Sequence, residues 1–305
     1  MEQDVLAGLP RRRFGRLGWQ VAPIGLGGAW LRGRAKERKP LEEAAETVLG
    51  AVRLGIDLID TSIRYGDSEL VIGQALKQLP PAARPRIATK SQVIKEPHEP
   101  AAGVYDSCLR SLARLGLERV DLFQIHEVEM YGWDRIMGPK GALEGLRRCR
   151  DEGLCEGIGV TGRPPDLLAR LVDTGEFDSV LTYYEYDLLT AAATRELMPA
   201  AERHEVAVIA GSPARMGLFA RPDGARWDHQ PADVRARVPR LEQLLGKAIH
   251  ELADESVRYL LADERIANIS IGSSRLSSLE SSIAAAAEGP LDPELVERLR
   301  EIGLS

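Results

Sequence analysis

Four side chains suited to moving a proton at an oxygen atom occur in the first half of the chain. Asp60, Tyr65, Lys90 and His126 each end or closely follow a short apolar run. A phenol with a pKa near ~10 is a poor acid or base at neutral pH, but a neighbouring ammonium favours the phenolate and lowers that pKa. We therefore expect Lys90 to tune Tyr65, Asp60 to keep the lysine charged and oriented, and His126 to hold a substrate oxygen.

Other reaction classes lack their usual residues in this pattern. No Ser or Cys is placed next to a base, so we expect no covalent nucleophile. His126, Glu127 and Glu129 are the best candidates for metal ligands, yet we expect no metal site. A proton donor without nucleophile or metal indicates hydride transfer from a dissociable cofactor. Two alternatives stay open: a lyase or aldolase that forms a Schiff base on Lys90, and a non-catalytic regulatory subunit that keeps the cofactor site.

The elements that must position these residues are short apolar runs without alternation, as in buried parallel strands. Each run is followed by a segment of helical periodicity, and the pattern occurs eight times. The sequence therefore predicts an α/β fold, a single (β/α)8 barrel domain over residues 1–305, with an open doubly wound sheet as the alternative. The predicted strands are residues 24–29, 56–59, 86–90, 120–126, 157–160, 180–184, 206–210 and 266–272.

Two segments lie outside this alternation. Residues 13–21 alternate around a pair of glycines and predict a short N-terminal hairpin. Residues 213–241 carry Gly, Pro and Trp227 without a clear period, and they predict a long loop after the seventh strand. Helical patterns are expected to resume near Leu244 and at residues 257–261.

The C-terminal ends of barrel strands carry function. Because neighbouring strands lie about 4.8 Å apart, the second, third and fourth strands should bring the four ionisable side chains into one sector of the barrel mouth. After the last strand, Gly272-Ser273-Ser274-Arg275 offers backbone amides, hydroxyls and a cation at a helix N-terminus. This combination suits a phosphate group.

Bulk composition narrows the class further. The net charge of −6 argues against a nucleic-acid-binding surface, and no apolar run approaches the ~20 residues of a membrane helix. The N-terminus lacks the order of a signal peptide, and three cysteines without CxxC spacing are typical of a reduced, cytoplasmic protein. We expect a monomer or small homo-oligomer that acts on a small molecule.

The chain resembles the aldo-keto reductases over nearly its whole length. The shared motifs are Asp60-Thr61-Ser62, Tyr65-Gly66, Ser68-Glu69, Ile72-Gly73-Gln74-Ala75-Leu76, Thr89-Lys90, Gln124-Ile125-His126, Gly157-Ile158-Gly159-Val160-Thr161 and Gly211-Ser212-Pro213. Within that family it is most similar to the aldose 1-dehydrogenase branch, which includes L-galactose, L-fucose and D-threo-aldose dehydrogenases. The segments that carry this narrower likeness are His126-Glu127-Val128-Glu129, Gly159-Val160-Thr161-Gly162, Leu181-Thr182-Tyr183-Tyr184 and Met216-Gly217-Leu218 with Trp227.

The resemblance implies a catalytic tetrad of Asp60, Tyr65, Lys90 and His126 and a nicotinamide dinucleotide extended across the barrel mouth. The implied substrate is an aldose or another small carbonyl compound. The cofactor-binding residues implied by the motifs and the phosphate loop are Thr161, Gly162, Tyr183, Gly211, Ser212, Pro213, Gly217, Gly272, Ser273, Ser274, Arg275, Ser278 and Ser282.

This sequence departs from the broad family pattern at several of these positions. Thr161-Gly162 stands where many members have Ser-Asn, Tyr183 replaces a Gln, and Gly211 replaces a stacking aromatic residue. Ser278 occupies the position that often holds an Arg for the 2′-phosphate of NADP. The cofactor is therefore expected to be NAD or NADP, with a preference for NAD, and Arg275 is an alternative phosphate partner.

Overall fold

A ring of eight parallel strands forms the centre of the computed structural model, which describes residues 5–33, 38–92, 99–221 and 230–305. The strands close in the order β10-β3-β4-β5-β6-β7-β8-β9, and this confirms the predicted barrel over the open sheet. Their bounds are β3 (Ile24–Gly27), β4 (Leu58–Asp60), β5 (Arg86–Lys90), β6 (Val120–Ile125), β7 (Cys155–Gly162), β8 (Ser179–Tyr183), β9 (Ala207–Gly211) and β10 (Ile266–Gly272).

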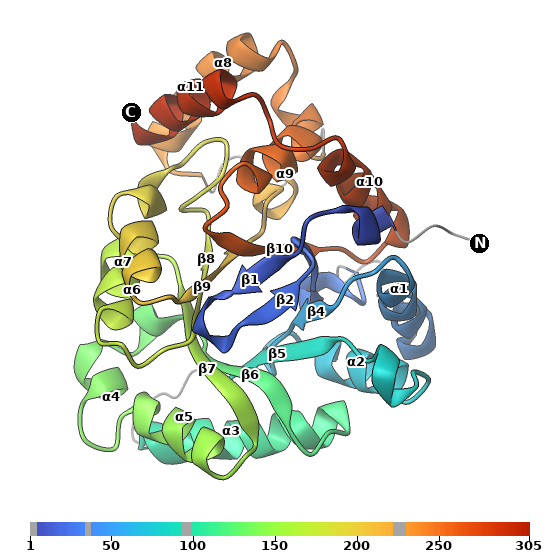
Figure 1. The fold of residues 1–305 in the computed structure, drawn as a ribbon, viewed down its shortest axis with the longest axis vertical. Coiled ribbons are helices and arrows are strands. Elements are labelled where there is room, and N and C mark those ends of the chain that lie inside the picture. Colours follow the sequence, from blue (N-terminus) through green and yellow to red (C-terminus); the bar gives the residue numbers. More distant parts are fainter. Residues whose placement is uncertain (1–4, 34–37, 93–98, 222–229) are drawn as a thin grey trace.

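Helices cover the outside of the ring (Figure 1). In α1, for example, Ala44, Val48 and Ala51 recur at helical spacing and are fully buried, as a core-facing stripe requires. The helices are α1 (Leu41–Arg53), α2 (Ser68–Leu76), α3 (Pro100–Leu115), α4 (Trp133–Met137), α5 (Ala142–Asp151), α6 (Pro165–Val172), α7 (Leu197–Arg203), α8 (Ala232–Leu245), α9 (Ala253–Leu261), α10 (Leu276–Ala287) and α11 (Pro293–Leu304). None of the helices described is long and apolar enough to cross a membrane.

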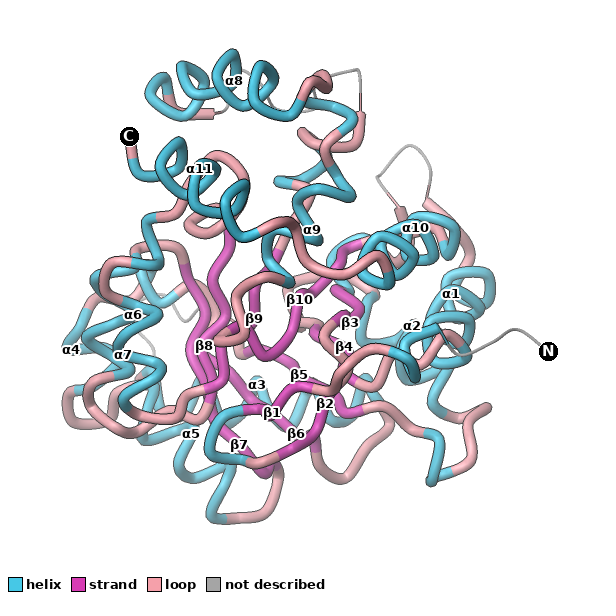
Figure 2. The backbone as a smooth tube through the Cα atoms, turned by 45° about the horizontal axis from the view of Figure 1, so that its top comes forward, coloured by secondary structure: helices cyan, strands magenta, loops and turns pink. Residues whose placement is uncertain are grey.

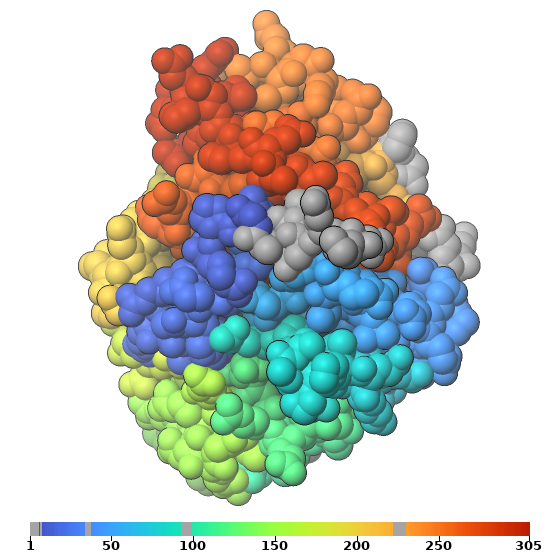
Figure 3. Space-filling model, turned by 45° about the vertical axis from the view of Figure 1, so that its right-hand side comes forward, coloured from blue at the N-terminus to red at the C-terminus, as the bar shows by residue number. Residues whose placement is uncertain are grey.

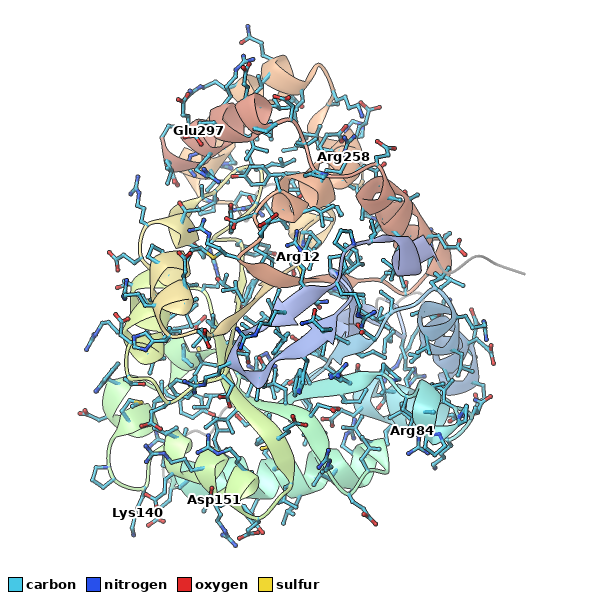
Figure 4. All side chains as sticks on the ribbon, viewed as in Figure 1. Arg12, Arg84, Lys140, Asp151, Arg258 and Glu297 are labelled. Atoms are coloured by element: carbon cyan, nitrogen blue, oxygen red, sulfur yellow. The ribbon has the colours of Figure 1, made fainter. Side chains whose placement is uncertain are left out.

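The predicted hairpin is present and closes the N-terminal end of the barrel. Strands β1 (Arg12–Phe14) and β2 (Trp19–Val21) pair antiparallel and lie in front of the ring in Figure 1. Phe14 is fully buried, and it packs with Trp19 against the side chains that the barrel strands bury inside the ring. Arg12, labelled in Figure 4, donates to the carbonyl oxygens of Asp263 at 3.0 Å and Ile266 at 2.6 Å. Because the hairpin fills the N-terminal end of the barrel, substrates must reach the opposite end, where the strands have their C-terminal residues.

The expectation for residues 213–241 was wrong in its second half. Helix α8 begins at Ala232, and Leu244 lies in its last turn and not at the start of a helix. One face of α8 is buried through Val234, Val238 and Leu241. In the sequence these residues are separated by arginines and by Pro239, a residue type that normally ends a helix. Part of the segment, residues 222–229 with Trp227, lies outside the described residues.

The C-terminal part of the chain adds structure that the sequence pattern did not indicate. Helix α11 packs against α8, and Figure 2 shows the two side by side outside the ring of strands. Helix α11 is preceded by Asp292, whose carboxylate accepts from the N–H of Glu294 at 2.9 Å, as an N-cap does. The first described turn, η1 (Val5–Gly8), packs against α10, and Figure 3 shows this blue N-terminal segment beside the orange-red part of the chain.

Candidate active site

The C-terminal ends of β4, β5 and β6 bring three of the predicted catalytic residues together. Asp60 is the last residue of β4 and pairs in register with Ala88 of β5. Lys90 lies two residues beyond Ala88, so its side chain leaves the same face of the strand. Lys90 in turn pairs with Gln124 on β6, one residue before the strand ends and two before His126. The strand register alone therefore gathers the cluster.

Lys90 is the centre of this cluster. Its ammonium donates to the carboxylate Oδ2 of Asp60, to the backbone carbonyl of Thr61 at 2.8 Å and to the hydroxyl of Tyr65 at 3.5 Å. These three partners match its three N–H donors. The other oxygen of Asp60, Oδ1, accepts from Nε2 of Gln124 at 3.2 Å. Asp60 is thus held on both sides, and Lys90 is fixed toward the phenol as predicted.

Burial decides the protonation of this cluster more strongly than the sequence suggested. Burial disfavours the Lys90 ammonium, but the carboxylate of Asp60 and then Tyr65 raise the lysine pKa above its ordinary value. Burial raises the pKa of Asp60, against Lys90 and Gln124. It also raises the pKa of Tyr65 by more than Lys90 lowers it. Lys90 thus lowers the pKa of Tyr65 in the expected direction, but burial outweighs it, and Tyr65 is a neutral phenol at neutral pH.

His126 follows β6 and faces Tyr65. The two rings meet edge to face, with centroids 5.5 Å apart and an interplanar angle of 85°. Burial, then Lys90 and Arg64, lowers the pKa of His126 to about 2, so the imidazole is neutral. The hydroxyl Oγ of Ser62 lies 3.0 Å from His126 Nδ1. Nothing in the sequence indicated this contact, because it is the turn after β4 that brings Ser62 across to β6.

The carboxylates considered as metal ligands point to other partners. Glu127 forms an ion pair with Arg64 across the mouth, and its backbone is strained, with φ at 52°. The carboxylate of Glu129 lies over Gly162, where an added Cβ would approach its Oε2 to 2.5 Å. Within the ranges described, no three His, Cys, Asp or Glu side chains gather as metal ligands.

The predicted cofactor residues lie mostly at the same end of the barrel. Thr161 and Gly162 end β7, Tyr183 ends β8, Gly211 ends β9 and Gly272 ends β10. Thr161 Oγ1 accepts from the N–H of Glu127 at 3.2 Å, which ties β7 to the loop after His126. Burial raises the pKa of Tyr183. Ser212 and Pro213 follow β9, and the turn from Arg215 to Gly217 has positive φ at each residue, a strained conformation.

The loop after β10 presents a helix N-terminus. Helix α10 has no side-chain cap, so its first amides are free to bind an anion, and Arg275 beside them is exposed. The hydroxyl of Ser273 accepts from the N–H of Arg275 at 3.0 Å and closes the turn itself. Ser278 lies in the first turn of α10, whereas Ser282 lies one turn further and donates to the carbonyl of Ser278 at 3.1 Å. Ser273 and Ser282 thus use their hydroxyls within the loop and the helix. The first backbone amides of α10, with Ser274, Ser278 and Arg275, are better placed to contact an anion.

Two buried residues of the site escaped the sequence reasoning as functional groups. Gln124 holds Asp60 from β6, and the signal for it was its place in the shared Gln124-Ile125-His126 motif. Glu69 is fully buried on α2 and accepts from Thr89 Oγ1 at 2.7 Å and from Arg114 Nε at 2.9 Å. It anchors the strand residue next to Lys90, and a polar residue in a first helical turn gives no sign of such burial.

Fold and cluster together define a class of protein: a (β/α)8-barrel enzyme with acid–base groups at the C-terminal ends of its strands. The chain belongs to the aldo/keto reductase family, whose model matches residues 23–303. It is similar to L-galactose dehydrogenase of Arabidopsis thaliana, with 32% identity over 288 residues, 91% of this chain and 88% of the relative. D-threo-aldose 1-dehydrogenase of a Pseudomonas species is 26% identical over 190 residues, 61% of this chain and 57% of the relative.

A solved structure supports the fold. The holo form of the aldo-keto reductase AKR11C1 from Bacillus halodurans matches with a TM-score of 0.77 and 21% identity, covering 96% of each chain. The family assignment makes this protein an NAD(P)-dependent oxidoreductase that acts on a small molecule. The Schiff-base alternative finds no support, because a Schiff base needs a neutral amine and Lys90 is a charged ammonium with three partners.

Proposed function

We propose that the protein oxidises an aldose at C1 to its lactone, or interconverts an aldehyde and an alcohol, with Tyr65 as the proton-transferring residue. The observation that carries this proposal is the Tyr65 hydroxyl 3.5 Å from Lys90 Nζ, beside a neutral imidazole. The names of the two curated relatives support the sugar substrate.

Each residue of the cluster has one task in this proposal. In reduction the neutral phenol of Tyr65 gives its proton to a carbonyl oxygen, and in oxidation its phenolate form takes the proton of the substrate hydroxyl group. Lys90 stabilises the phenolate left behind, and Asp60 keeps Lys90 charged and directed at Tyr65. His126 donates from its ring to the substrate oxygen and holds it against the phenol. Burial of these groups strengthens their mutual electrostatic effects.

The residues at the barrel mouth fit a nicotinamide dinucleotide. When bound, the cofactor supplies or accepts the hydride at the carbon next to the reacting oxygen. The uncapped start of α10 with Arg275 supplies donors for a phosphate, and the strained turn from Arg215 to Gly217 turns the chain after β9 at the same mouth. Thr161, Gly162 and Tyr183 are proposed to lie beside the nicotinamide. We propose NAD as the preferred form, because Ser278 in the first turn of α10 carries no charge for a 2′-phosphate.

The test is a Tyr65→Phe variant assayed with a panel of aldoses and aldehydes. Loss of the proton donor should lower kcat/KM by about 10²- to 10⁴-fold, whereas the affinity for NADH, measured by fluorescence titration, should stay within about twofold. Tyr105→Phe is a matched control, because Tyr105 lies on α3 and its hydroxyl bonds to exposed Glu152. The same titration of the wild type with NADPH should give the weaker binding.

Three outcomes would count against the proposal. Turnover near that of the wild type in Tyr65→Phe would remove Tyr65 from the mechanism. Tighter binding of NADPH than of NADH would reverse the cofactor preference. NADH binding without turnover of any sugar or aldehyde by the wild type would favour the regulatory subunit.

A further inference from the structure

Ser62 makes two hydrogen bonds with one hydroxyl group. Its Oγ accepts from the backbone N–H of Arg64 at 3.1 Å, which closes a short turn directly after β4. The same Oγ lies 3.0 Å from Nδ1 of His126, and the side chain of Ser62 is fully buried. A serine hydroxyl has one proton to donate. Among the residues described, His126 Nδ1 is the acceptor within reach of that proton.

We propose that Ser62 is a positioning residue that holds His126 in the tautomer with its proton on Nε2. If Ser62 donates to Nδ1, that nitrogen is unprotonated, and the single ring proton of a neutral imidazole must sit on Nε2. Nε2 is then a donor. The inference rests on the proposed function, because only a donor nitrogen can hold a substrate carbonyl or hydroxyl oxygen in the role assigned to His126.

Burial of the ring, and then the charges around it, prevent the alternative in which both nitrogens carry protons. Lys90 and Arg64 both oppose a positive imidazole. The carboxylate of Glu127 is engaged by Arg64, and Tyr65, which meets the ring edge to face, is itself neutral. The ring therefore stays neutral, and the choice between its two tautomers is left to the hydrogen bond at Nδ1.

The Ser62–His126 pair is not a nucleophilic dyad. An attacking serine must reach the substrate, whereas Ser62 is 0% exposed and its Oγ is already fixed between Arg64 and His126. A general base must also accept a proton, and the pKa of about 2 makes His126 a very weak base. The hydroxyl thus acts on the imidazole, and the imidazole acts on the substrate.

The tautomer can be observed directly by NMR on ¹⁵N-histidine-labelled protein. The chain has five histidines, and the signals of His126 are identified by their absence from the spectrum of a His126→Gln variant. Two-bond ¹H–¹⁵N correlations distinguish a protonated from an unprotonated ring nitrogen. In the wild type we expect a protonated Nε2 and an unprotonated Nδ1 over the neutral pH range, without substrate or cofactor.

Three variants test the role of the hydroxyl. Ser62→Ala should give a mixture of tautomers and lower kcat/KM by about five- to tenfold, the effect of one hydrogen bond on an equilibrium. Ser62→Thr keeps the hydroxyl and should restore the single tautomer. Ser62→Cys, with a weaker donor in a similar volume, should lie between them. A merely structural role would lower the melting temperature of Ser62→Ala without changing its tautomer.

The outcomes separate this inference from the proposed function. A protonated Nδ1 in the wild type, or an unchanged tautomer in Ser62→Ala, would overturn the inference whatever the activity. With the His126 signals assigned, the wild-type spectrum gives this answer even if no Ser62 variant folds. The expected tautomer together with full activity of His126→Gln would leave Ser62 in its role and remove His126 from the mechanism.

Discussion

Replacing Lys90 by methionine tests the buried ion pair at the centre of the cluster. Asp60 and Lys90 are 5% and 1% exposed, and the variant leaves the carboxylate with Gln124 as its described side-chain partner. Methionine is unbranched and apolar, so the change removes the charge and retains most of the packing. Breaking a buried pair by removing one partner costs about 3–5 kcal/mol. We expect a loss of unfolding free energy in this range at about pH 8.

The pH dependence of this loss is the sharper part of the prediction. Burial already raises the pKa of Asp60 above the value of about 3.9 in an unfolded chain, and Lys90 is the largest cause that opposes the rise. A carboxyl whose folded pKa is raised binds a proton in the native state before it does in the unfolded state. Stability therefore falls as pH rises toward the folded pKa, by up to about 1.4 kcal/mol per pH unit. Lys90→Met should recover stability relative to the wild type as the pH is lowered from about 8 to about 5.

Urea unfolding followed by circular dichroism measures both effects. The matched control is the double variant Asp60→Asn with Lys90→Met, which removes both charges. It should be more stable than Lys90→Met at about pH 8 and should lack the extra pH dependence. An unfolding free energy of Lys90→Met within about 0.5 kcal/mol of the wild-type value at about pH 8 would refute the reasoning. So would a deficit that is the same at both pH values.

Two further predictions concern the same end of the barrel. Because the pKa of Tyr65 is raised, kcat/KM for oxidation should keep rising with pH up to at least about pH 10. The kcat/KM for reduction should stay level below about pH 10. A plateau for oxidation near neutral pH would contradict this. Gly162→Ala should cost less than about 1 kcal/mol in urea unfolding, because the atom nearest to its Cβ, at 2.5 Å, is Oε2 at the end of the exposed Glu129 side chain, which can swing away, and Glu129→Ala in the same chain should remove that cost. A larger loss that Glu129→Ala does not relieve would contradict this expectation, because it would show that the Glu129 carboxylate is not the group that opposes the new methyl group.

The barrel could be predicted because its strands are buried on both sides. The segments Arg86–Lys90 and Ile266–Gly272 are buried at nearly every position, and both were predicted with the bounds that the structure has. Helix α8 could not be recognised in this way, because it packs outside the barrel on α11 and buries a narrow face. Pro239 within that helix is a local signal against a helix, and the tertiary contact overrides it.

The site could be predicted as a set of strand ends but not as a network. Position after a strand places Asp60, Lys90 and His126 at one end, and this required no knowledge of side-chain contacts. The net shift of the Tyr65 pKa depends on how deeply the phenol is buried, which a sequence does not reveal. The contact between Ser62 and His126 depends on the direction of a turn, since the two residues are 64 positions apart.

The turn after β4 organises the site more than any single strand does. Asp60 and the carbonyl of Thr61 bind Lys90, Ser62 binds His126, Arg64 binds Glu127, and Tyr65 returns to Lys90. The turn is itself fixed, because the N–H of Tyr65 donates to the carbonyl of Ser62 at 2.9 Å. One stretch from residue 60 to residue 65 therefore sets the position of the phenol and contacts both residues that act on it. Since Lys90 and His126 come from different strands, a shift of this turn would change proton transfer and substrate orientation together. Variants in the turn should for this reason be compared by tautomer and pH dependence, and not by activity alone.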